Sequence, residues 1–317
     1  MEKIVEQVSK ELLLRELTND RFIRKTNNGN NEIYIITHHN SPNVMREIGR
    51  LREVTFRHAG GGTGKSIDID EFDTCSHPYQ QLLVWNPEDQ EIVGAYRFIL
   101  CKDAEYINGK VQLATTELFN FSQQFYKEYL PFTIELGRSF IQPLYQPSEQ
   151  FRKGLFSLDN LWDGLGALVV DNPSQKYFYG KVTMYTDFNV VARDYILTFM
   201  LHYFPDAEKL VTPIHGLNNK TDVSNFLNEL KNMDYKAGHA HLNKMVRALG
   251  ENIPPLVNAY MNLSSTMKSF GTAINPTFGD VEETGILVTI NDIYQSKKER
   301  HINSYLLEKG ISLNNDN

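Results

Sequence analysis

Two strand-like segments carry ionisable residues among apolar neighbours, and this pattern restricts the fold more than any other feature of the sequence. Arg97 stands in the run IVGAYRFIL, and Glu135 and Arg138 stand in FTIELGRSFIQ. Both runs have the hydrophobic character of strands in the centre of a sheet. A buried guanidinium or carboxylate costs free energy unless it is paired. We therefore expect these charges to meet partners from other parts of the chain inside the fold.

The spacing of Glu135 and Arg138 predicts an irregularity in the second strand. Side chains alternate along a strand, so residues three positions apart face opposite sides of the sheet. A β-bulge at Gly137 would return Arg138 to the face of Glu135 and would splay the strand locally. Splayed strands leave backbone N–H groups that can bind an acyl carbonyl or an extended ligand.

The segment IDIDEFD supplies carboxylates that can pair with the arginines. Asp68 and Asp70 share a face if the segment is extended, and Asp73 can join them after a turn. Arg52, on the preceding predicted helix, is a third cation. Such a network can form a functional site, or it can only attach a loop to the sheet, and the spacing leaves both interpretations open.

The glycine-rich stretch AGGGTGKS (59–66) contains the letters of a nucleotide-binding loop. A phosphate-binding loop follows a strand and opens a helix. Here a predicted helix over 42–57 enters the loop, and an acidic extended segment follows it. The required order is reversed, and the carboxylates would repel a triphosphate. The sequence therefore favours a mobile surface loop over a nucleotide site.

Hydrophobic periodicity predicts an α/β (α+β) fold with a mixed, largely antiparallel sheet flanked by helices. The bulged, splayed strand lies at its centre, and a helical C-terminal elaboration begins at about residue 205. We assign 1–30 to an N-terminal amphipathic helix, 31–310 to a single domain and 311–317 to a disordered tail. The expected helices cover 2–17, 42–57, 115–129, 157–172, 190–204, 221–232, 239–250 and 254–269, and the expected strands cover 33–37, 79–85, 91–101, 132–142, 177–185 and 285–292. A charged terminal helix is expected after the last strand.

Charge and cysteine content limit the partners and the compartment. The net charge of -7 disfavours nucleic acid, because phosphate contacts need clustered lysine and arginine. Two cysteines, Cys75 and Cys101, exclude a disulfide framework and are typical of a reducing compartment. Cys75 with His77, and His239 with His241, lack a complete ligand set, so no metal is expected. No apolar run is long enough to span a bilayer, so we expect a cytoplasmic protein whose N-terminal helix either packs inward or makes a peripheral contact with the inner membrane face.

Several motifs occur in the order in which a known family carries them. They are LREVTFR (51–57), DIDEFD (68–73), VGAYRF (93–98), ELGRSFI (135–141) and LWDGLGALVV (161–170). In these motifs the chain resembles the GNAT-related N-acyltransferases that begin ornithine-lipid and glycine-lipid synthesis, often labelled hemolysin-like, with acyl-homoserine-lactone synthases as more distant relatives. The later segment PPLVNAYMNLSSTMKSFGTAINPTFG is similar to the lipid-synthesis branch. The resemblance covers roughly residues 40 to 290.

The resemblance implies a GNAT-like fold whose bulged fourth strand splays from the fifth. It implies no bound cofactor, an acyl thioester on the phosphopantetheine arm of acyl carrier protein as co-substrate, and a small amino acid, glycine or ornithine, as acceptor. The chain departs from the pattern in its AGGGTGKS loop, its long helical N-terminus and the missing glycine-rich pyrophosphate signature of acetyl-CoA-binding GNATs. The last departure weakens the case for coenzyme A (CoA) as the carrier. By motif position, the family's charged cluster corresponds to Arg52, Asp68, Asp70, Asp73, Arg97, Glu135 and Arg138.

Transfer to an amine needs a base, because an amine near neutral pH is mostly protonated. Glu135 is the first candidate and Asp70 the second. Burial would raise the pKa of Glu135 whereas Arg138 would lower it, and the sequence does not decide between the two effects. Arg97 or Arg138 would hold the acceptor's carboxylate, and backbone N–H groups at the bulge would stabilise the oxyanion. We therefore assign catalysis to Glu135, Asp70, Arg97 and Arg138, and substrate binding to Arg52, Asp68, Asp73, Gly137 and Ser139.

An acidic carrier protein needs a basic docking surface on an enzyme that is itself acidic. Arg152 and Lys153 follow the bulged strand and are assigned to this surface, although a solvated loop explains the pair equally well. Other functions stay open at this point. They are a transferase like the acyl-homoserine-lactone synthases or an acyl-CoA-dependent GNAT, a nucleotide-binding protein, and a noncatalytic scaffold that binds the carrier protein.

Overall fold

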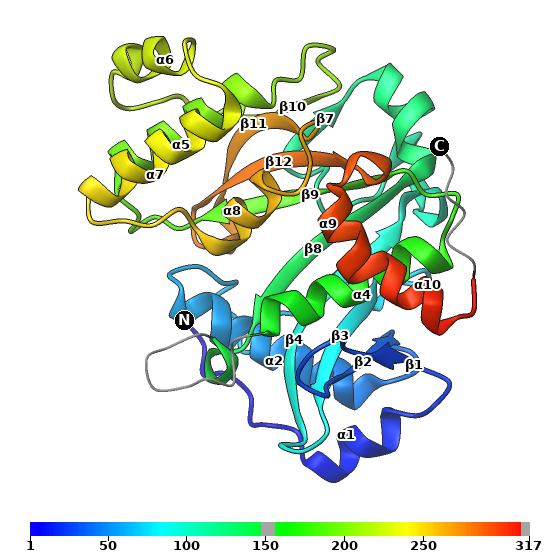
Figure 1. Ribbon diagram of the computed structural model, residues 1–317. Coiled ribbons are helices and arrows are strands. Elements are labelled where there is room, and N and C mark those ends of the chain that lie inside the picture. The colour runs from blue at the N-terminus through cyan, green and yellow to red at the C-terminus, as the bar shows by residue number, and fades with distance from the viewer. Residues whose placement is uncertain (147–155, 312–317) are drawn as a thin grey trace.

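The centre of the protein is an eight-stranded mixed sheet, drawn in Figure 1. The computed structural model describes residues 1–146 and 156–311. Neighbouring strands are antiparallel except for β8 and β9, which run parallel. The order across the sheet is β1 (Phe22–Lys25), β2 (Glu32–Ile36), β3 (Gln80–Asn86), β4 (Glu91–Leu100), β8 (Thr133–Ile141), β9 (Tyr177–Met184), β12 (Val281–Thr289) and β11 (Lys268–Asn275).

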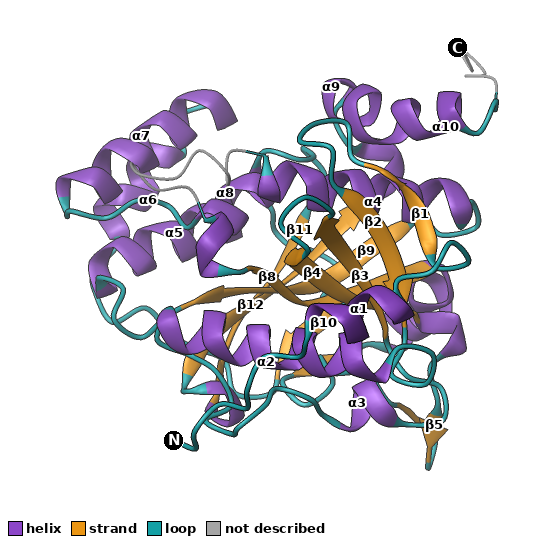
Figure 2. Cartoon of the chain, turned by 90° about the horizontal axis from the view of Figure 1, so that it is seen from below, coloured by secondary structure: helices purple, strands orange, loops and turns teal. Residues whose placement is uncertain are grey.

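Helices cover both faces of this sheet, as Figure 2 shows. On one face lie α1 (Lys10–Glu16) and α2 (Pro42–His58), whose apolar residues share a core with alternate residues of β2, β3 and β4. On the other face, α4 (Ser157–Asp171) and α5 (Val190–Tyr203) share a larger core with the intervening residues of these strands. A sheet that is buried on both faces requires this pattern, because side chains alternate along each strand. The predicted mixed, largely antiparallel sheet between helices is confirmed.

Shorter strands and helices complete the fold around the main sheet. Two small antiparallel pairs are formed by β5 (Tyr106–Ile107) with β6 (Lys110–Val111), and by β7 (Phe119–Phe121) with β10 (Val211–Pro213). The shorter and later helices are α3 (Glu71–Thr74), α6 (Ser224–Leu230), α7 (Tyr235–Ala248), α8 (Pro255–Met261), α9 (Gln295–Lys298) and α10 (Ser304–Glu308). Helices α6, α7 and α8 form the predicted helical elaboration and pack on the same core as α5.

Strands β8 and β9 pair over only part of their length and then separate. Their register ends where Leu136 lies opposite Gly180. Beyond that point β8 continues along β4 to Ile141, and β9 continues along β12 to Met184. Gly180 permits the close approach at the point of separation, because a Cβ atom there would lie 2.6 Å from the Leu136 carbonyl oxygen. The predicted splay of the central strand is therefore present.

The bulge of β8 lies one residue after the glycine that predicted it. In the register with β4, the single residue between Ala95 and Arg97 lies opposite two residues of β8, Arg138 and Ser139. Arg138 rather than Gly137 takes the left-handed backbone conformation, with φ of 49°. The extra residue turns the Arg138 side chain toward the α2 face, where its guanidinium contacts an aromatic ring of that core.

The N-terminal helix is shorter than predicted. Helix α1 starts only at Lys10, so the predicted helix over 2–17, within an assigned unit 1–30, is wrong for residues 2–9. The backbone N–H groups of Glu2 and Val5 donate to carbonyl oxygens of the glycine-rich loop. These tertiary hydrogen bonds attach the segment to the loop, and the amphipathic pattern does not become helical there.

Two other predicted helices are interrupted by strands. Residues 115–129 contain β7 and a π-helical stretch, Phe125–Tyr129, because β7 pairs with β10 from a distant part of the chain. Helix α8 ends at Met261, and β11 begins at Lys268, inside the predicted helix 254–269. Strand β11 pairs with β12. Local periodicity does not report such long-range pairings, which depend on the neighbouring strand.

The C-terminal helices α9 and α10 lie near α4 in Figure 1. His301, between them, bonds through Nδ1 to Asp163 of α4 at 2.7 Å. The predicted disordered tail covers 311–317, and its residues 312–317 lie outside the described residues. Across the described ranges, no helix combines the length and the apolar character that crossing a membrane requires.

Candidate active site

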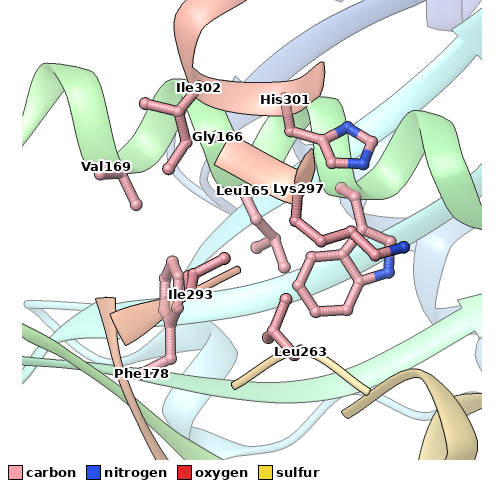
Figure 3. A pocket seen from close by; sticks show the side chains of 10 residues that line it. Leu165, Gly166, Val169, Phe178, Leu263, Ile293, Lys297, His301 and Ile302 are labelled. Carbon is pink, nitrogen blue, oxygen red and sulfur yellow. The ribbon is translucent and has the colours of Figure 1, made fainter. Parts of the chain in front are cut away.

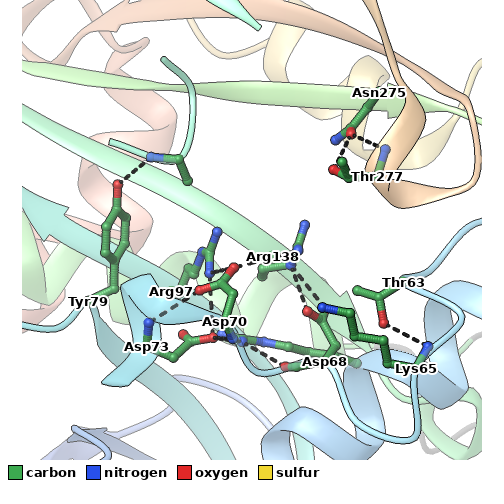
Figure 4. A network of polar contacts seen from close by, with 12 residues as sticks. Thr63, Lys65, Asp68, Asp70, Asp73, Tyr79, Arg97, Arg138, Asn275 and Thr277 are labelled. Carbon is green, nitrogen blue, oxygen red and sulfur yellow. Dashed lines mark hydrogen bonds and ion pairs between the residues drawn. The ribbon is translucent and has the colours of Figure 1, made fainter. Parts of the chain in front are cut away.

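Three arginines and three aspartates form one ion-pair network on the α2 face of the sheet, beside the bulge (Figure 4). Each arginine approaches one aspartate within 2.7 to 3.0 Å: Arg52 approaches Asp73, Arg97 approaches Asp70 and Arg138 approaches Asp68. Longer contacts, at 3.5 Å between Arg97 and Asp73 and at 3.8 Å between Arg138 and Asp70, join the pairs. Its three positive charges balance its three negative charges. The predicted pairing of these arginines and aspartates is therefore confirmed.

A local motif positions two of the carboxylates. Asp70 is the N-cap of α3 and accepts a hydrogen bond from the Asp73 N–H, while the Asp73 carboxylate accepts one from the Asp70 N–H. This capping box fixes both side chains relative to each other. Gln81 of β3 donates to Asp73 at 3.0 Å and accepts from Arg52 of α2. Helix, turn and sheet are thereby joined through Asp73.

Burial and pairing act against each other on the aspartates. Burial raises the pKa of Asp68, and Arg138 offsets this only in part. Burial also acts to raise the pKa of Asp70, but Arg97 and then Arg138 outweigh it and hold this pKa well below its usual range. Asp70 therefore stays ionised beside the arginines and is a poor proton acceptor. The electrostatics favour Glu135 over Asp70 as the base.

Glu135 lies outside the ion-pair network and is also buried. Its side chain is 1% exposed, and its Oε1 accepts a hydrogen bond from the Thr115 N–H at 3.1 Å. Its Oε2 has no hydrogen-bond donor among the described residues. Burial raises the pKa of Glu135 to about 7, against the opposing charges of Lys181 and Arg97. Burial thus outweighs the cations, and Lys181, not Arg138, is the main opposing charge. A carboxyl with this pKa can exchange a proton near neutral pH.

A cavity of about 710 Å³ lies between the separated parts of β8 and β9. Its polar walls, on the α2 face, include Arg97, Thr115, Glu135, Arg138, Tyr179 and Lys181. Its apolar walls, on the opposite face, include Leu136, Phe178, Leu256, Tyr260, Ile286 and Val288. The cavity therefore passes through the sheet from a polar to an apolar compartment. This size and lining are typical of a site for a small molecule with an apolar part.

The structure separates the predicted site residues into two groups. Those that line the cavity are Arg97, Glu135, Gly137, Arg138 and Ser139. Those that support it from the ion-pair network are Arg52, Asp68, Asp70 and Asp73, none of which lines the cavity. The predicted docking residues Arg152 and Lys153 lie outside the described residues. Substrate contact by any of these side chains stays a prediction.

Sequence reasoning missed a lysine–glutamate pair on the cavity wall. Lys181 of β9 lies 2.7 Å from Glu283 of β12, and the Glu283 carboxylate also accepts from Asn275 at 3.0 Å. The available signal was one charged residue in the otherwise uncharged run YFYGKVTMY, the same kind of signal that Arg97 gave. Its partner was not visible, because Glu283 belongs to a strand far along the chain.

The glycine-rich loop binds a carboxylate of its own chain. Glu53 of α2 accepts hydrogen bonds from the N–H groups of Thr63 and Gly64 and from the Thr63 hydroxyl, at 2.7 to 3.1 Å. Phosphate groups would need these same backbone donors. The Ser66 N–H is also occupied, by Glu2 at 2.8 Å. A carboxylate thus fills the position of a phosphate, which argues against the nucleotide-binding hypothesis.

A second, smaller pocket does not have the features of a substrate site. Figure 3 shows it between α4 and the C-terminal helices, with Leu165, Phe178 and Ile293 pointing into it. Its volume of about 20 Å³ has room for about one water molecule. In the part of the chain that the structure describes, no cluster of histidine, cysteine or acidic side chains could hold a metal ion.

Comparison with known proteins gives the domain type and two close relatives. Residues 51–153 match the acetyltransferase (GNAT) domain. The chain is 57% identical to the glycine N(alpha)-acyltransferase of Bacteroides thetaiotaomicron, over 96% of this chain and 91% of that protein. It is 55% identical to the glycine N(alpha)-acyltransferase of Phocaeicola vulgatus, over 96% of this chain and 94% of that protein. The domain match confirms the predicted GNAT-like fold.

Two solved structures show a weaker similarity. The acyl-homoserine-lactone synthase LasI is 16% identical, with a TM-score of 0.33 over 48% of this chain and 72% of that chain. The CoA-dependent acyl-homoserine lactone synthase BjaI, solved with SAM and isopentyl-CoA, is 12% identical, with a TM-score of 0.37 over 88% of this chain and 89% of that chain.

Proposed function

The chain belongs to the N-acyltransferase family of these two bacterial relatives, and from that premise we propose that it transfers a fatty acyl group from a thioester to the amine of glycine. Both relatives carry glycine in their names and match this chain over nearly its whole length. The observation that carries the proposal is Glu135, a carboxyl with a pKa of about 7 and an unbonded Oε2 within the described structure, at the wall of a cavity between splayed strands.

The residues support direct transfer without an acylated enzyme. Glu135 takes a proton from the glycine ammonium, and the neutral amine attacks the thioester carbonyl carbon. A carbon–nitrogen bond forms, the carbonyl π electrons move onto oxygen, and their return expels the thiolate. The thiolate takes the second proton of the nitrogen and leaves as a free thiol, and Glu135 releases its proton to solvent before the next cycle. The products are N-acylglycine and the thiol of the carrier.

The bulge offers donors for the oxyanion in this reaction. Arg138 and Ser139 stand outside the one-to-one register of β8 with β4, and both line the cavity. We assign their backbone N–H groups to the developing negative charge. One such donor contributes about 3 kcal/mol to transition-state stabilisation in comparable sites. The Arg52–Asp73 pair acts through other residues, because it fixes the turn whose Asp70 holds Arg97.

The apolar half of the cavity is our proposed site for the acyl chain. Its walls are aliphatic and aromatic, and the cavity joins them to the polar half without leaving the protein. A long acyl chain, with or without a 3-hydroxyl group, on the phosphopantetheine arm of an acyl carrier protein fits this shape. The product would then be the first intermediate of an amino-acid lipid. An acyl-CoA donor and ornithine as acceptor are the competing assignments.

A donor and acceptor screen tests the proposal. The purified protein is incubated with either acyl carrier protein thioester or acyl-CoA, together with glycine, ornithine, serine or alanine, and products are identified by mass spectrometry. We expect N-acylglycine as the main product, formed faster from the carrier protein thioester. The Glu135→Gln variant serves as the control for enzymatic transfer. Absence of N-acylglycine with both donors would refute the proposal, and preference for ornithine would correct the acceptor.

A further inference from the structure

Lys181 is a half-buried cation on the cavity wall, and we propose that it binds the carboxylate of the acceptor amino acid. This inference rests on the proposed function and adds a residue that recognises the substrate. It assigns the two charges of a zwitterionic acceptor to two groups on one face of the sheet. Glu135 meets the ammonium, and Lys181 meets the carboxylate.

The register of β8 and β9 places these two groups on the same face. Glu135 lies opposite Tyr179 in the parallel pair, and Lys181 is two residues beyond Tyr179 on β9. Residues two apart on a strand point to the same side, so Lys181 faces the same compartment as Tyr179. Pairing with β8 ends at Gly180, which makes Lys181 the first residue of β9 at the open part of the cavity. Its charge also reaches Glu135, on which it is the largest influence opposing burial.

Among the cavity's cations in the described residues, Lys181 pairs with the fewest carboxylates. Arg97 and Arg138 each lie within 4 Å of two carboxylates, and Arg138 also stacks at 4.3 Å on the ring of Phe278. The Lys181 ammonium has three N–H donors. Among the described residues, Glu283 alone is an ion-pair partner for it, at 2.7 Å. Glu283 thus orients the ammonium and leaves donors for a ligand anion.

Polar atoms without a hydrogen bond lie on the same cavity wall as the two charges. The Thr115 and Tyr179 hydroxyls and the Glu135 Oε2 have no hydrogen-bond partner within the described structure. All three side chains are about 1% exposed and line the cavity. Buried polar atoms without partners are costly, and a bound polar ligand removes that cost. An amino acid offers donors on its ammonium for the Glu135 oxygen and acceptors on its carboxylate for the hydroxyls.

Glycinamide provides the measurement that separates carboxylate binding from other roles. It has the same amine as glycine but a neutral amide in place of the carboxylate. We expect the parent protein to prefer glycine by kcat/KM. Lys181→Met should raise the KM for glycine about 10- to 100-fold, the range for loss of a charge-assisted hydrogen bond, with no change in the KM for the acyl donor. At a pH above the acidic limb of both proteins, its kcat/KM for glycinamide should stay near that of the parent, so the preference for glycine disappears.

Three further variants keep the test decisive. Lys181→Met leaves the 5% exposed Glu283 side chain unpaired, so the double variant Lys181→Met/Glu283→Gln removes both charges and preserves neutrality. Lys181→Arg should retain the preference for glycine. Lys268→Met, on β11, is the matched control, because it breaks a 3.0 Å pair with Glu208 away from the cavity lining. This variant should leave kcat/KM unchanged for both glycine and glycinamide.

The outcomes distinguish this inference from the proposed function. If the parent protein acylates glycine and the double variant keeps the full preference over glycinamide, Lys181 is not the anchor and the proposed function still stands. Equal rates of the parent on glycine and glycinamide would also refute the inference. If the parent acylates neither compound with any donor, the proposed function itself fails.

Discussion

Glu135 lies opposite Tyr179 in the parallel β8–β9 pair, one position before that pairing ends. This register places a buried carboxyl at the point where two adjacent strands begin to separate. The backbone around Glu135 is held on both sides, by β4 and by β9, while its side chain borders the cavity. The ionisable group is thus held by paired strands and faces the cavity in which we propose that the substrates meet. The predictions below test the consequences of this placement.

Replacement of Glu135 by glutamine should abolish most turnover. The amide keeps the shape and the capacity to accept from Thr115 but no longer takes a proton. We expect kcat for glycine acylation to fall by about 10²- to 10⁴-fold, the usual contribution of a general base, with the fold unchanged. Steady-state kinetics together with circular dichroism check this. A Gln variant with turnover close to the parent would assign the proton transfer to another group or to water.

The pH dependence of kcat should show an acidic limb near 7. Glu135 acts as a base only when ionised, and burial raises its pKa to about 7, so the rate should rise with pH below that value and level off above it. Lys181 lowers this pKa, so Lys181→Met should move the limb to higher pH. A pH series of kcat at saturating substrates measures both. A limb near the ordinary glutamate value would show that Glu135 does not control the rate.

Breaking the ion-pair network should cost stability. The side chains of Asp73 and Arg52 are both 0% exposed, so Asp73→Ala leaves a buried guanidinium without its counter-ion. We expect the free energy of unfolding to fall by about 3 to 5 kcal/mol. Urea denaturation followed by tryptophan fluorescence measures it. Lys3→Ala, which breaks an exposed pair with Glu6, is the control and should produce no measurable change.

The glycine-rich loop should have no nucleotide-dependent role. Lys65 is exposed, and the loop's backbone donors are bonded to Glu53. Lys65→Ala should leave glycine acylation unchanged and alter the free energy of unfolding by less than about 0.5 kcal/mol. ATP with magnesium should not raise the melting temperature of the parent protein. A concentration-dependent rise that Lys65→Ala removes would revive the nucleotide hypothesis.

The sequence predicted the ion-pair network and the splay because their causes are local. A charged residue in an apolar strand must find a partner, and the acids at 68, 70 and 73 lie one loop away from Arg52. The glycine before Arg138 also marked the bulge to within one residue. The sequence could not show whether burial or the nearby positive charges have the larger effect on the pKa of Glu135, since this depends on how completely the fold encloses that side chain.

The missed features depend on contacts between distant segments. The Lys181–Glu283 pair requires β12 to lie beside β9, and the sequence does not specify which strands become neighbours. Strand β11 continues a segment whose spacing suited a helix, and its pairing with β12 outweighs that preference. In the same way, the first nine residues form hydrogen bonds with the glycine-rich loop instead of a helix.

The cavity that passes through the sheet has a consequence for the order of events. With one compartment on each face, acyl donor and amino acid can reach the meeting point without either blocking the other. Both can then be present together. Double-reciprocal plots of initial rate against acyl-donor concentration, at several fixed glycine concentrations, should therefore intersect, whereas parallel lines would indicate an acylated enzyme. The finished amide would span the sheet, with its acyl tail on one face and its head group on the other. It must leave toward one face before the next cycle begins.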